Sequence, residues 1–231
     1  MRRRIFLKLA IFTAFALTLT GNIYAQESRP FWNEVQEFQH KDSLQMPRKH
    51  GIVFLGSSSI RKWVDAEKHF KKYNVINRGF GGSTLLQATE YVDYLLVPYA
   101  PRQVVIYSGE NDIATDSVDA DETLKRFQAL ITKIRSKLID VPIVYLSIKQ
   151  SPSRTGFTEV VLKSNSLIKD YLATLPNTIF LDVNSKMLDA KGALRPELFE
   201  SDMLHMKPAG YAIWEKELKP YLIKKSGQKT H

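Results

Sequence analysis

Short apolar runs alternate with longer segments of helical periodicity along this chain. Five runs have strand character, at residues 52–55, 73–77, 103–107, 142–148 and 178–181. Apolar residues recur at helical spacing over residues 30–44, 84–96, 121–138, 159–172 and from 208 onward. Strands that alternate with helices at short intervals are typical of a doubly wound parallel sheet. The pattern therefore predicts a single α/β domain over residues 26–231, without an internal repeat.

The first 25 residues have a different pattern. Three arginines follow Met1, residues 5–19 are almost continuously apolar, and the chain turns polar after Ala25. This succession predicts a secretory signal peptide over residues 1–25, and hence a protein that is exported to the periplasm or secreted. We expect no membrane span after cleavage. An uncleaved membrane anchor is the alternative interpretation.

The composition narrows the possible classes of site and partner. The chain has 231 residues, enough for one domain with a sizeable core, and it contains no cysteine. Disulfides, thiolate metal sites, cysteine nucleophiles and a lipidated N-terminal cysteine are thereby excluded. The formal charge is +9, and it falls to +5 without residues 1–25, which carry four basic residues and no acid. The remaining basic pairs are scattered and form no stripe with aromatic residues, so we expect no nucleic-acid partner.

Polar residues and glycines follow the predicted strands at the point where each strand ends. Ser58 follows the first strand, Gly82 the second and Asn111 the third. Asp202 and His205 follow the fifth. The carboxyl ends of parallel strands share one edge of a sheet, which is where open α/β sheets bind ligands. We therefore expect these five residues to meet at that edge.

These residue types are the ones that acyl transfer requires. The hydroxyl of Ser58 is a weak nucleophile and needs a base, which His205 can supply because imidazole titrates near neutrality. Asp202 stands three residues before His205 and can hold the ring in the required tautomer. The backbone N–H groups of Ser58 and Gly82 and the side-chain amide of Asn111 are candidate donors to an oxyanion.

Each of these features also has a structural interpretation when it is taken alone. Serines after a strand commonly cap a helix. The glycines at 81–82 and the Asn-Asp pair at 111–112 can simply form turns, and the Asp/His pair can cap the last helix. No pair of histidines has metal-ligand spacing on a helix, so we expect no metal site. Three further acids are better interpreted as loop caps than as a cation site: Asp182, Asp189 and Glu200.

Four short motifs together resemble those of a known family. They are GSSS at 56–59, NRGFGGS at 77–83, GEND at 109–112 and DMLH at 202–205. In this order and at these spacings they resemble the motifs of SGNH/GDSL-type hydrolases, over essentially the whole mature chain. Each motif is weakly specific by itself, and the combination is specific.

The chain departs from the family pattern at two positions beside the serine. Ser57 stands where the family usually has the acid of Gly-Asp-Ser. In this feature the chain resembles a subgroup that includes proteins similar to the catalytic subunit of platelet-activating factor acetylhydrolase. Ile60 stands where a G-x-S-x-G elbow has its second glycine. The second departure argues against a standard α/β-hydrolase.

The resemblance implies both a fold and a set of residue roles. The implied fold is a three-layer α/β/α sandwich with a five-stranded, parallel, flavodoxin-like sheet. The implied nucleophile is Ser58, with Asp202 and His205 as its Asp/His pair and with Ser58, Gly82 and Asn111 as oxyanion donors. Members of the family need no metal and no organic cofactor.

The sequence thus predicts a serine esterase or acylhydrolase that acts through an acyl-serine intermediate on an extracytoplasmic carboxylic ester, such as an acetylated glycan or a lipid. The absence of a long apolar lid segment favours short acyl groups. Arg154 follows the fourth strand, where it can contact an anionic or sugar substrate or only anchor its loop. Two alternatives stay open: an O-acetyltransferase that uses the same acyl-serine, and a non-catalytic carbohydrate- or peptide-binding module on the same fold.

Overall fold

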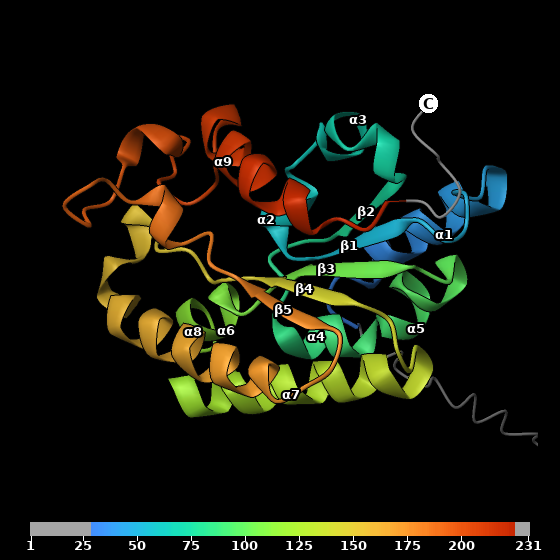
Figure 1. Ribbon diagram of the computed structural model, residues 1–231, viewed down its shortest axis with the longest axis horizontal. Coiled ribbons are helices and arrows are strands. Elements are labelled where there is room, and N and C mark those ends of the chain that lie inside the picture. The colour runs from blue at the N-terminus through green and yellow to red at the C-terminus, as the bar shows by residue number, and fades with distance from the viewer. Residues whose placement is uncertain (1–28, 225–231) are drawn as a thin grey trace, which may run out of the picture.

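A five-stranded parallel sheet forms the centre of the protein (Figure 1). The computed structural model describes residues 29–224, so the predicted signal peptide lies outside the described residues. The strands are β1 (Ile52–Gly56), β2 (Val75–Gly79), β3 (Gln103–Tyr107), β4 (Ile143–Leu146) and β5 (Thr178–Leu181). Their order across the sheet is β2-β1-β3-β4-β5, and all neighbours are parallel. This is the flavodoxin-like order, and the predicted fold class is confirmed.

Helices cover both faces of the sheet and complete a three-layer sandwich. In Figure 1, α4, α5, α7 and α8 lie below the sheet, and α3 and α9 lie above it. No helix within residues 29–224 combines the length and the apolar character that crossing a membrane requires. The α-helices of this part of the chain are α1 (Trp32–Leu44), α2 (Ser58–Arg61), α3 (Ala66–His69), α4 (Leu85–Glu90), α5 (Val92–Leu95), α6 (Glu110–Ala114), α7 (Ala120–Lys137), α8 (Thr158–Ala173) and α9 (Pro208–Leu218).

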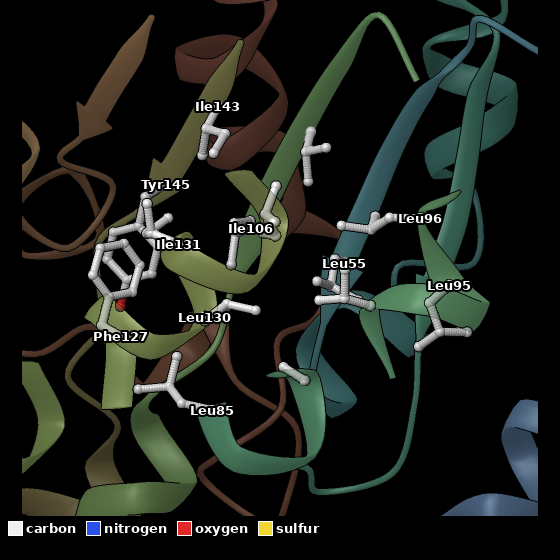
Figure 2. Close-up of a cluster of buried hydrophobic side chains, with 14 of the residues drawn as sticks. Leu55, Leu85, Leu95, Leu96, Ile106, Phe127, Leu130, Ile131, Ile143 and Tyr145 are labelled. Atoms are coloured by element: carbon white, nitrogen blue, oxygen red, sulfur yellow. The ribbon is translucent and has the colours of Figure 1, made fainter. Parts of the chain in front are cut away.

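The central strands bury apolar side chains on both faces, as a parallel sheet between two helical layers must. On β1, Val53 and Leu55 face the cluster that includes α4, α5 and α7, whereas Ile52 and Phe54 face α3 and α9. Figure 2 shows the first cluster, in which side chains of β1, β3 and β4 meet those of the covering helices. Every residue of β1 and β3 is buried, which accounts for the continuous apolar runs in the sequence.

The second strand differs from its predicted range, because it begins at Val75 and continues through Arg78 to Gly79. A charged residue normally ends a buried strand. Here the buried guanidinium of Arg78 donates hydrogen bonds to the Asp42 carboxylate and the Tyr99 hydroxyl, both at 2.7 Å. The charge is thereby compensated, so the strand can continue.

The helix predicted over residues 84–96 is divided into α4 and α5 at Tyr91. Tyr91 leaves helical geometry with φ −97° and ψ 8°, and its hydroxyl donates to the Pro30 carbonyl at 2.6 Å. Ser83 comes directly before the predicted helix, where a serine is the expected N-cap, but it does not cap α4. The Ser83 hydroxyl donates to the Phe80 carbonyl instead, and Thr84 caps α4 through a capping box with Gln87.

Two glycines at strand ends let the short helix α2 approach the sheet closely. A Cβ atom on Gly56 would lie 2.1 Å from the Tyr107 carbonyl oxygen of β3 and 2.9 Å from the Ile60 side chain of α2. One on Gly79 would lie 2.2 Å from the backbone nitrogen of Arg61 in α2. All of these distances are shorter than a van der Waals contact. The position of α2, which begins at Ser58, therefore depends on the missing side chains at both strand ends.

The N-terminal helix α1 is tied to the glycine-rich loop after β2. The Glu34 carboxylate on α1 accepts hydrogen bonds from the Gly81 backbone N–H at 2.9 Å and from the Arg61 guanidinium at 3.2 Å. Gly81 has φ 41°, and a Cβ atom on it would lie 2.1 Å from the Phe31 ring. The loop therefore needs glycine at this position for both its backbone conformation and its contact with α1.

Replacing Gly79 by alanine should destabilise the protein, because the added methyl group collides with the backbone of α2. We expect a loss of about 1–3 kcal/mol in the free energy of unfolding, measured by urea denaturation. Gly156→Ala is the matched control, since a Cβ atom there meets nothing within 4 Å, and it should stay within about 0.5 kcal/mol of wild type. Equal stability of the Gly79 variant and the control would contradict the close packing of α2 on β2.

Replacing Glu34 by alanine should loosen the glycine-rich loop, because the Gly81 N–H loses its carboxylate acceptor. A hydrogen bond to a charged group contributes about 1.5–3 kcal/mol, so hydrogen exchange at the Gly81 amide should accelerate roughly 10- to 100-fold, as measured by NMR. Glu37→Ala removes an acid of the same helix that pairs only with Lys41 among residues 29–224, and should leave this exchange rate unchanged. Equal rates in the two variants would show that α1 does not hold the loop.

Candidate active site

Ser58 lies at the carboxyl end of β1, as the first residue of α2. Ser57 occupies the N-cap position, where its extended backbone (φ −83°, ψ −161°) turns the chain from strand into helix. The Ser57 N–H still donates to the Tyr107 carbonyl of β3 at 3.2 Å, and the Ser59 carbonyl accepts from the buried Tyr211 hydroxyl at 2.9 Å. Ser57 stands at the N-cap position but makes no side-chain capping hydrogen bond, so the capping interpretation does not account for these serines, and Ser58 is partly exposed.

A chain of hydrogen bonds joins Ser58 to His205 and Asp202. The Ser58 hydroxyl lies 3.0 Å from Nε2 of His205, although 147 positions separate the two residues. Nδ1 of His205 lies 2.5 Å from the Asp202 carboxylate, whose other oxygen accepts the backbone N–H groups of Leu204 and His205. With Nδ1 protonated toward the carboxylate, Nε2 is left as the acceptor that faces the hydroxyl.

The Asp202 carboxylate is stabilised in its ionised form. Partial burial by itself raises the pKa of Asp202, but the hydrogen bonds from the His205 ring and from two backbone N–H groups outweigh it. They hold the pKa of this carboxyl well below its usual range. Asp202 therefore carries a negative charge beside the imidazole at any pH near neutrality.

The loop that carries the Asp/His pair is itself fixed in place. Phe199 and Met206 form an antiparallel bridge, and the Glu200 N–H donates to the His205 carbonyl at 2.7 Å. Met203, at the tip, has φ 54°, and its carbonyl accepts both the backbone N–H and the hydroxyl of Ser153 at 3.0 Å. The imidazole is thus positioned by contacts with a second loop, the one that follows β4.

Three groups whose N–H donors are not all used in hydrogen bonds lie beyond the carboxyl ends of β1, β2 and β3. Within residues 29–224, the backbone N–H groups of Ser58 and Gly82 donate to no acceptor. The Asn111 side chain uses one of its two N–H bonds for the Ser83 carbonyl at 3.1 Å. Gly82 and Asn111 are neighbours, since a Cβ atom on Gly82 would lie 3.8 Å from Nδ2 of Asn111. These are the donors that the sequence singled out for an oxyanion.

The GEND motif is the start of a helix rather than a turn. Gly109 precedes α6 with φ 117°, a conformation that favours glycine, and Asn111 lies in the first turn of the helix. The neighbouring Asp112 is buried and accepts the Leu85 N–H at 2.9 Å and the Arg126 guanidinium at 3.0 Å. α6 is therefore bonded to both α4 and α7, which fixes the position of Asn111.

Arg154 lies against Asn111 rather than pointing only to solvent. Its guanidinium donates to Oδ1 of Asn111 at 3.0 Å and to the Glu110 carbonyl at 3.4 Å. The side chain of Arg154 is 18% exposed. Of the two roles considered for Arg154, contact with substrate or anchoring of its loop, these contacts are those of an anchor beside Asn111.

Glu110 and Lys149 form a buried ion pair at the site, which was not predicted from the sequence. The Lys149 ammonium lies 2.9 Å and 3.1 Å from the two carboxylate oxygens of Glu110, and both side chains are almost fully buried. The hydroxyls of Tyr107 and Ser151 donate to the same carboxylate at 2.6 Å and 2.7 Å. A signal was available, since Glu110 follows β3 and Lys149 follows β4, which puts opposite charges at adjacent strand ends.

The surroundings of Glu110 shift its pKa toward the ionised form. Burial by itself raises the pKa of Glu110, but Lys149, Arg154 and the two hydroxyls outweigh it and the pKa is lowered. Burial lowers the pKa of Lys149 and Glu110 opposes this effect. The carboxylate receives hydrogen bonds on both oxygens, so the charged form is the one that the surroundings favour.

Asp182 and Asp189, two of the acids interpreted as loop caps, accept backbone hydrogen bonds from their own loops. Asp182 accepts the Ser185 N–H at 3.0 Å, and Asp189 accepts the Lys191 and Ala193 N–H groups at 2.8 Å. Within residues 29–224, no group of three or more His, Asp or Glu side chains is arranged to hold a metal ion. The polar groups at the carboxyl edge can instead activate a hydroxyl and stabilise a negative oxygen.

Solved structures of other proteins have the same fold. A protein of Streptococcus pneumonia that is provisionally described as a platelet activating factor superposes with a TM-score of 0.73 at 23% identity, over 84% of this chain and 92% of that chain. A provisionally assigned acylhydrolase of Bacteroides fragilis gives 0.71 at 23% identity, over 83% and 96%. An acetyl-xylooligosaccharide esterase of Geobacillus gives 0.61 at 14% identity, over 79% and 98%. At these identities the likeness establishes the fold.

The family is established by sequence. The comparison with curated proteins found no match. The sequence profile of the GDSL-like Lipase/Acylhydrolase family matches residues 55–213, which include every residue of the site described above. The chain therefore belongs to the GDSL-like lipase/acylhydrolase family of ester hydrolases.

Proposed function

We propose that this protein is a serine esterase of the Ser-His-Asp type, with Ser58 as the nucleophile. The observation that supports this most directly is the continuous hydrogen-bonded chain from the Ser58 hydroxyl through His205 to Asp202. A nucleophile, a base in contact with it and a group that orients the base are the three parts that acyl transfer by serine requires.

In the proposed first half-reaction, Nε2 of His205 takes the proton of Ser58 as Oγ attacks the ester carbonyl. The negative charge that develops on the carbonyl oxygen is stabilised by the Ser58 and Gly82 N–H groups and the free N–H of Asn111. The C–O bond to the alcohol then breaks, His205 donates its proton to the leaving oxygen, and an acyl-serine remains.

In the second half-reaction a water molecule replaces the alcohol. His205 takes a proton from the water as it attacks the acyl-serine, and the same three donors stabilise the second tetrahedral oxyanion. Collapse of this intermediate returns the proton to Ser58 and releases the carboxylic acid. Asp202 keeps its charge throughout and stabilises the imidazolium that forms in each half-reaction.

We infer that the substrate is an extracytoplasmic ester with a short acyl group, on a glycan or a lipid. The signal-peptide pattern of residues 1–25 supports export to the periplasm or secretion. Gly82 and Asp202 are exposed and Ser58 is partly exposed, so an ester on a bulky alcohol can reach the serine. One protein with the same fold is an acetyl-xylooligosaccharide esterase, which supports acetylated glycans as the first substrates to test.

Replacing Ser58 by alanine should abolish hydrolysis of p-nitrophenyl acetate and acetylated xylan in a protein that still folds. Ser59→Ala is the matched control and should retain activity, because the Ser59 contact described above uses the backbone carbonyl and not the hydroxyl. Wild-type turnover by the Ser58 variant would overturn the proposed nucleophile.

A fluorophosphonate probe should label wild type at Ser58, and a protein that only binds carbohydrate would stay unlabelled. Product analysis with an acceptor glycan separates hydrolysis from acetyl transfer.

Replacing Asp202 by asparagine should lower kcat by roughly 10⁴-fold, because the amide no longer favours the imidazole tautomer that accepts the Ser58 proton. The low pKa of Asp202 keeps the wild-type carboxylate ionised below the titration range of an ordinary aspartate, so the deficit should persist from about pH 5 to pH 8. Asp189→Asn changes an aspartate whose hydrogen bonds, among residues 29–224, are all within its own turn, and it should retain activity. A deficit that disappears anywhere in this pH range would contradict the role given to Asp202.

A further inference from the structure

We propose that Arg154 is a positioning residue that acts on the reaction through Asn111. The inference rests on the proposed function, because it concerns the oxyanion donor of that reaction. The guanidinium is bonded to the Asn111 side chain at the oxygen end of the amide, and the donor that we assign to the oxyanion is at the nitrogen end.

The two contacts of the Asn111 amide fix its orientation. Oδ1 accepts from the Arg154 guanidinium at 3.0 Å, and Nδ2 donates to the Ser83 carbonyl at 3.1 Å. Rotating the amide by 180° would place its N–H groups against a cation and its oxygen against a carbonyl, and both contacts would be repulsive. Without Arg154 only the Ser83 contact would oppose this rotation. The guanidinium therefore keeps an N–H, and not an oxygen, available to the substrate.

The positive charge of Arg154, next to Asn111, is not fully compensated by Glu110. Glu110 lies near two cations, Lys149 at 2.9 Å and Arg154 at 3.4 Å, and the shorter pair with Lys149 compensates its charge. The three charges therefore sum to one net positive charge behind the amide. A cation bonded to an amide oxygen polarises the amide, which makes its N–H groups stronger donors. Because Arg154 is only 18% exposed, solvent screens this effect less than it would at the surface.

Arg154 is held for this task by the same network. Its second terminal nitrogen lies 3.4 Å from both the carbonyl and the carboxylate of Glu110. Lys149 and Ser151 bond the same carboxylate. Since both terminal nitrogens of the guanidinium face protein acceptors, the contacts of Arg154 direct it toward Asn111. A planar, two-pronged cation fits this arrangement, whereas a lysine ammonium would reach only one of the acceptors.

A double-mutant cycle between Arg154 and Asn111 tests the inference. On p-nitrophenyl acetate, Arg154→Met should lower kcat roughly 10- to 100-fold with little change in KM, as expected for the loss of a charge-assisted hydrogen bond. Asn111→Ala should lower kcat by roughly 10²–10³-fold. The double variant should be no slower than Asn111→Ala alone, because Arg154 has no further route to the reaction. Arg154→Lys should lie between wild type and Arg154→Met.

The inference would be overturned if the losses in kcat were additive in the double variant, or if Arg154→Met changed only KM. Either result would indicate direct contact of Arg154 with the substrate or a general structural role. Arg48→Met is the matched control, because Arg48 is an exposed arginine in the loop that enters β1 at the opposite edge of the sheet, and its activity should equal that of wild type. If Arg154→Met does not fold, the cycle with Arg154→Lys and Arg154→Gln gives the same comparison. Failure of the proposed function is recognised separately, since Ser58→Ala would then retain activity.

Discussion

The close packing of α2 against the ends of three strands is the constraint on which the site depends. α2 is only four residues long, from Ser58 to Arg61, and a helix of this length has no stability of its own. Its position follows from contacts with its surroundings: the Ser57 N–H bonds to β3, and the backbone of α2 lies directly on Gly79 of β2. The nucleophile candidate is therefore held by the sheet itself.

The polar groups of the site are supported by charges buried behind them. Glu110 and Lys149 lie at adjacent strand ends, and together with Arg154 they support the start of α6, which carries Asn111. Burying charged side chains costs free energy that packing apolar side chains does not. The pairing of these charges therefore contributes less to the stability of the protein than to a defined arrangement of the side chains. A buried polar network in which every member has a partner is rigid, and rigidity is what a preorganised set of donors requires.

The N-terminal helix extends the site beyond the segment that defines the family. The family profile begins at residue 55, yet Glu34 of α1 accepts the Gly81 N–H and Asp42 of the same helix compensates the buried Arg78. One end of α1 thereby supports the loop that carries Gly82, and the other end supports the strand that leads into it. The part of the chain outside the family segment thus takes part in holding the loop that carries Gly82, one of the proposed oxyanion donors.

Sequence patterns determined the fold class and the edge at which the site forms. Alternation of buried strands with amphipathic helices leaves few arrangements besides a doubly wound parallel sheet, and in such a sheet the residues after each strand must meet at one edge. The sequence could therefore single out five residues together, because each follows a strand and because their types fit one reaction: Ser58, Gly82, Asn111, Asp202 and His205.

The local exceptions to these patterns were decided by tertiary contacts. Arg78 continues a strand only because Asp42 reaches it, and the division of α4 from α5 accompanies a hydrogen bond from Tyr91 to Pro30.

Only the tertiary structure could decide which polar side chains contact one another at that edge. The bond between Ser58 and His205 spans 147 positions, and the partner of Arg154 is 43 positions away. Periodicity reports which face of an element is buried, but it carries no information on the direction of a long, flexible side chain such as that of arginine or lysine. The orientation of Arg154 toward Asn111 and the pairing of Lys149 with Glu110 follow from the packing of separate loops against one another, and this packing exists only in the folded protein.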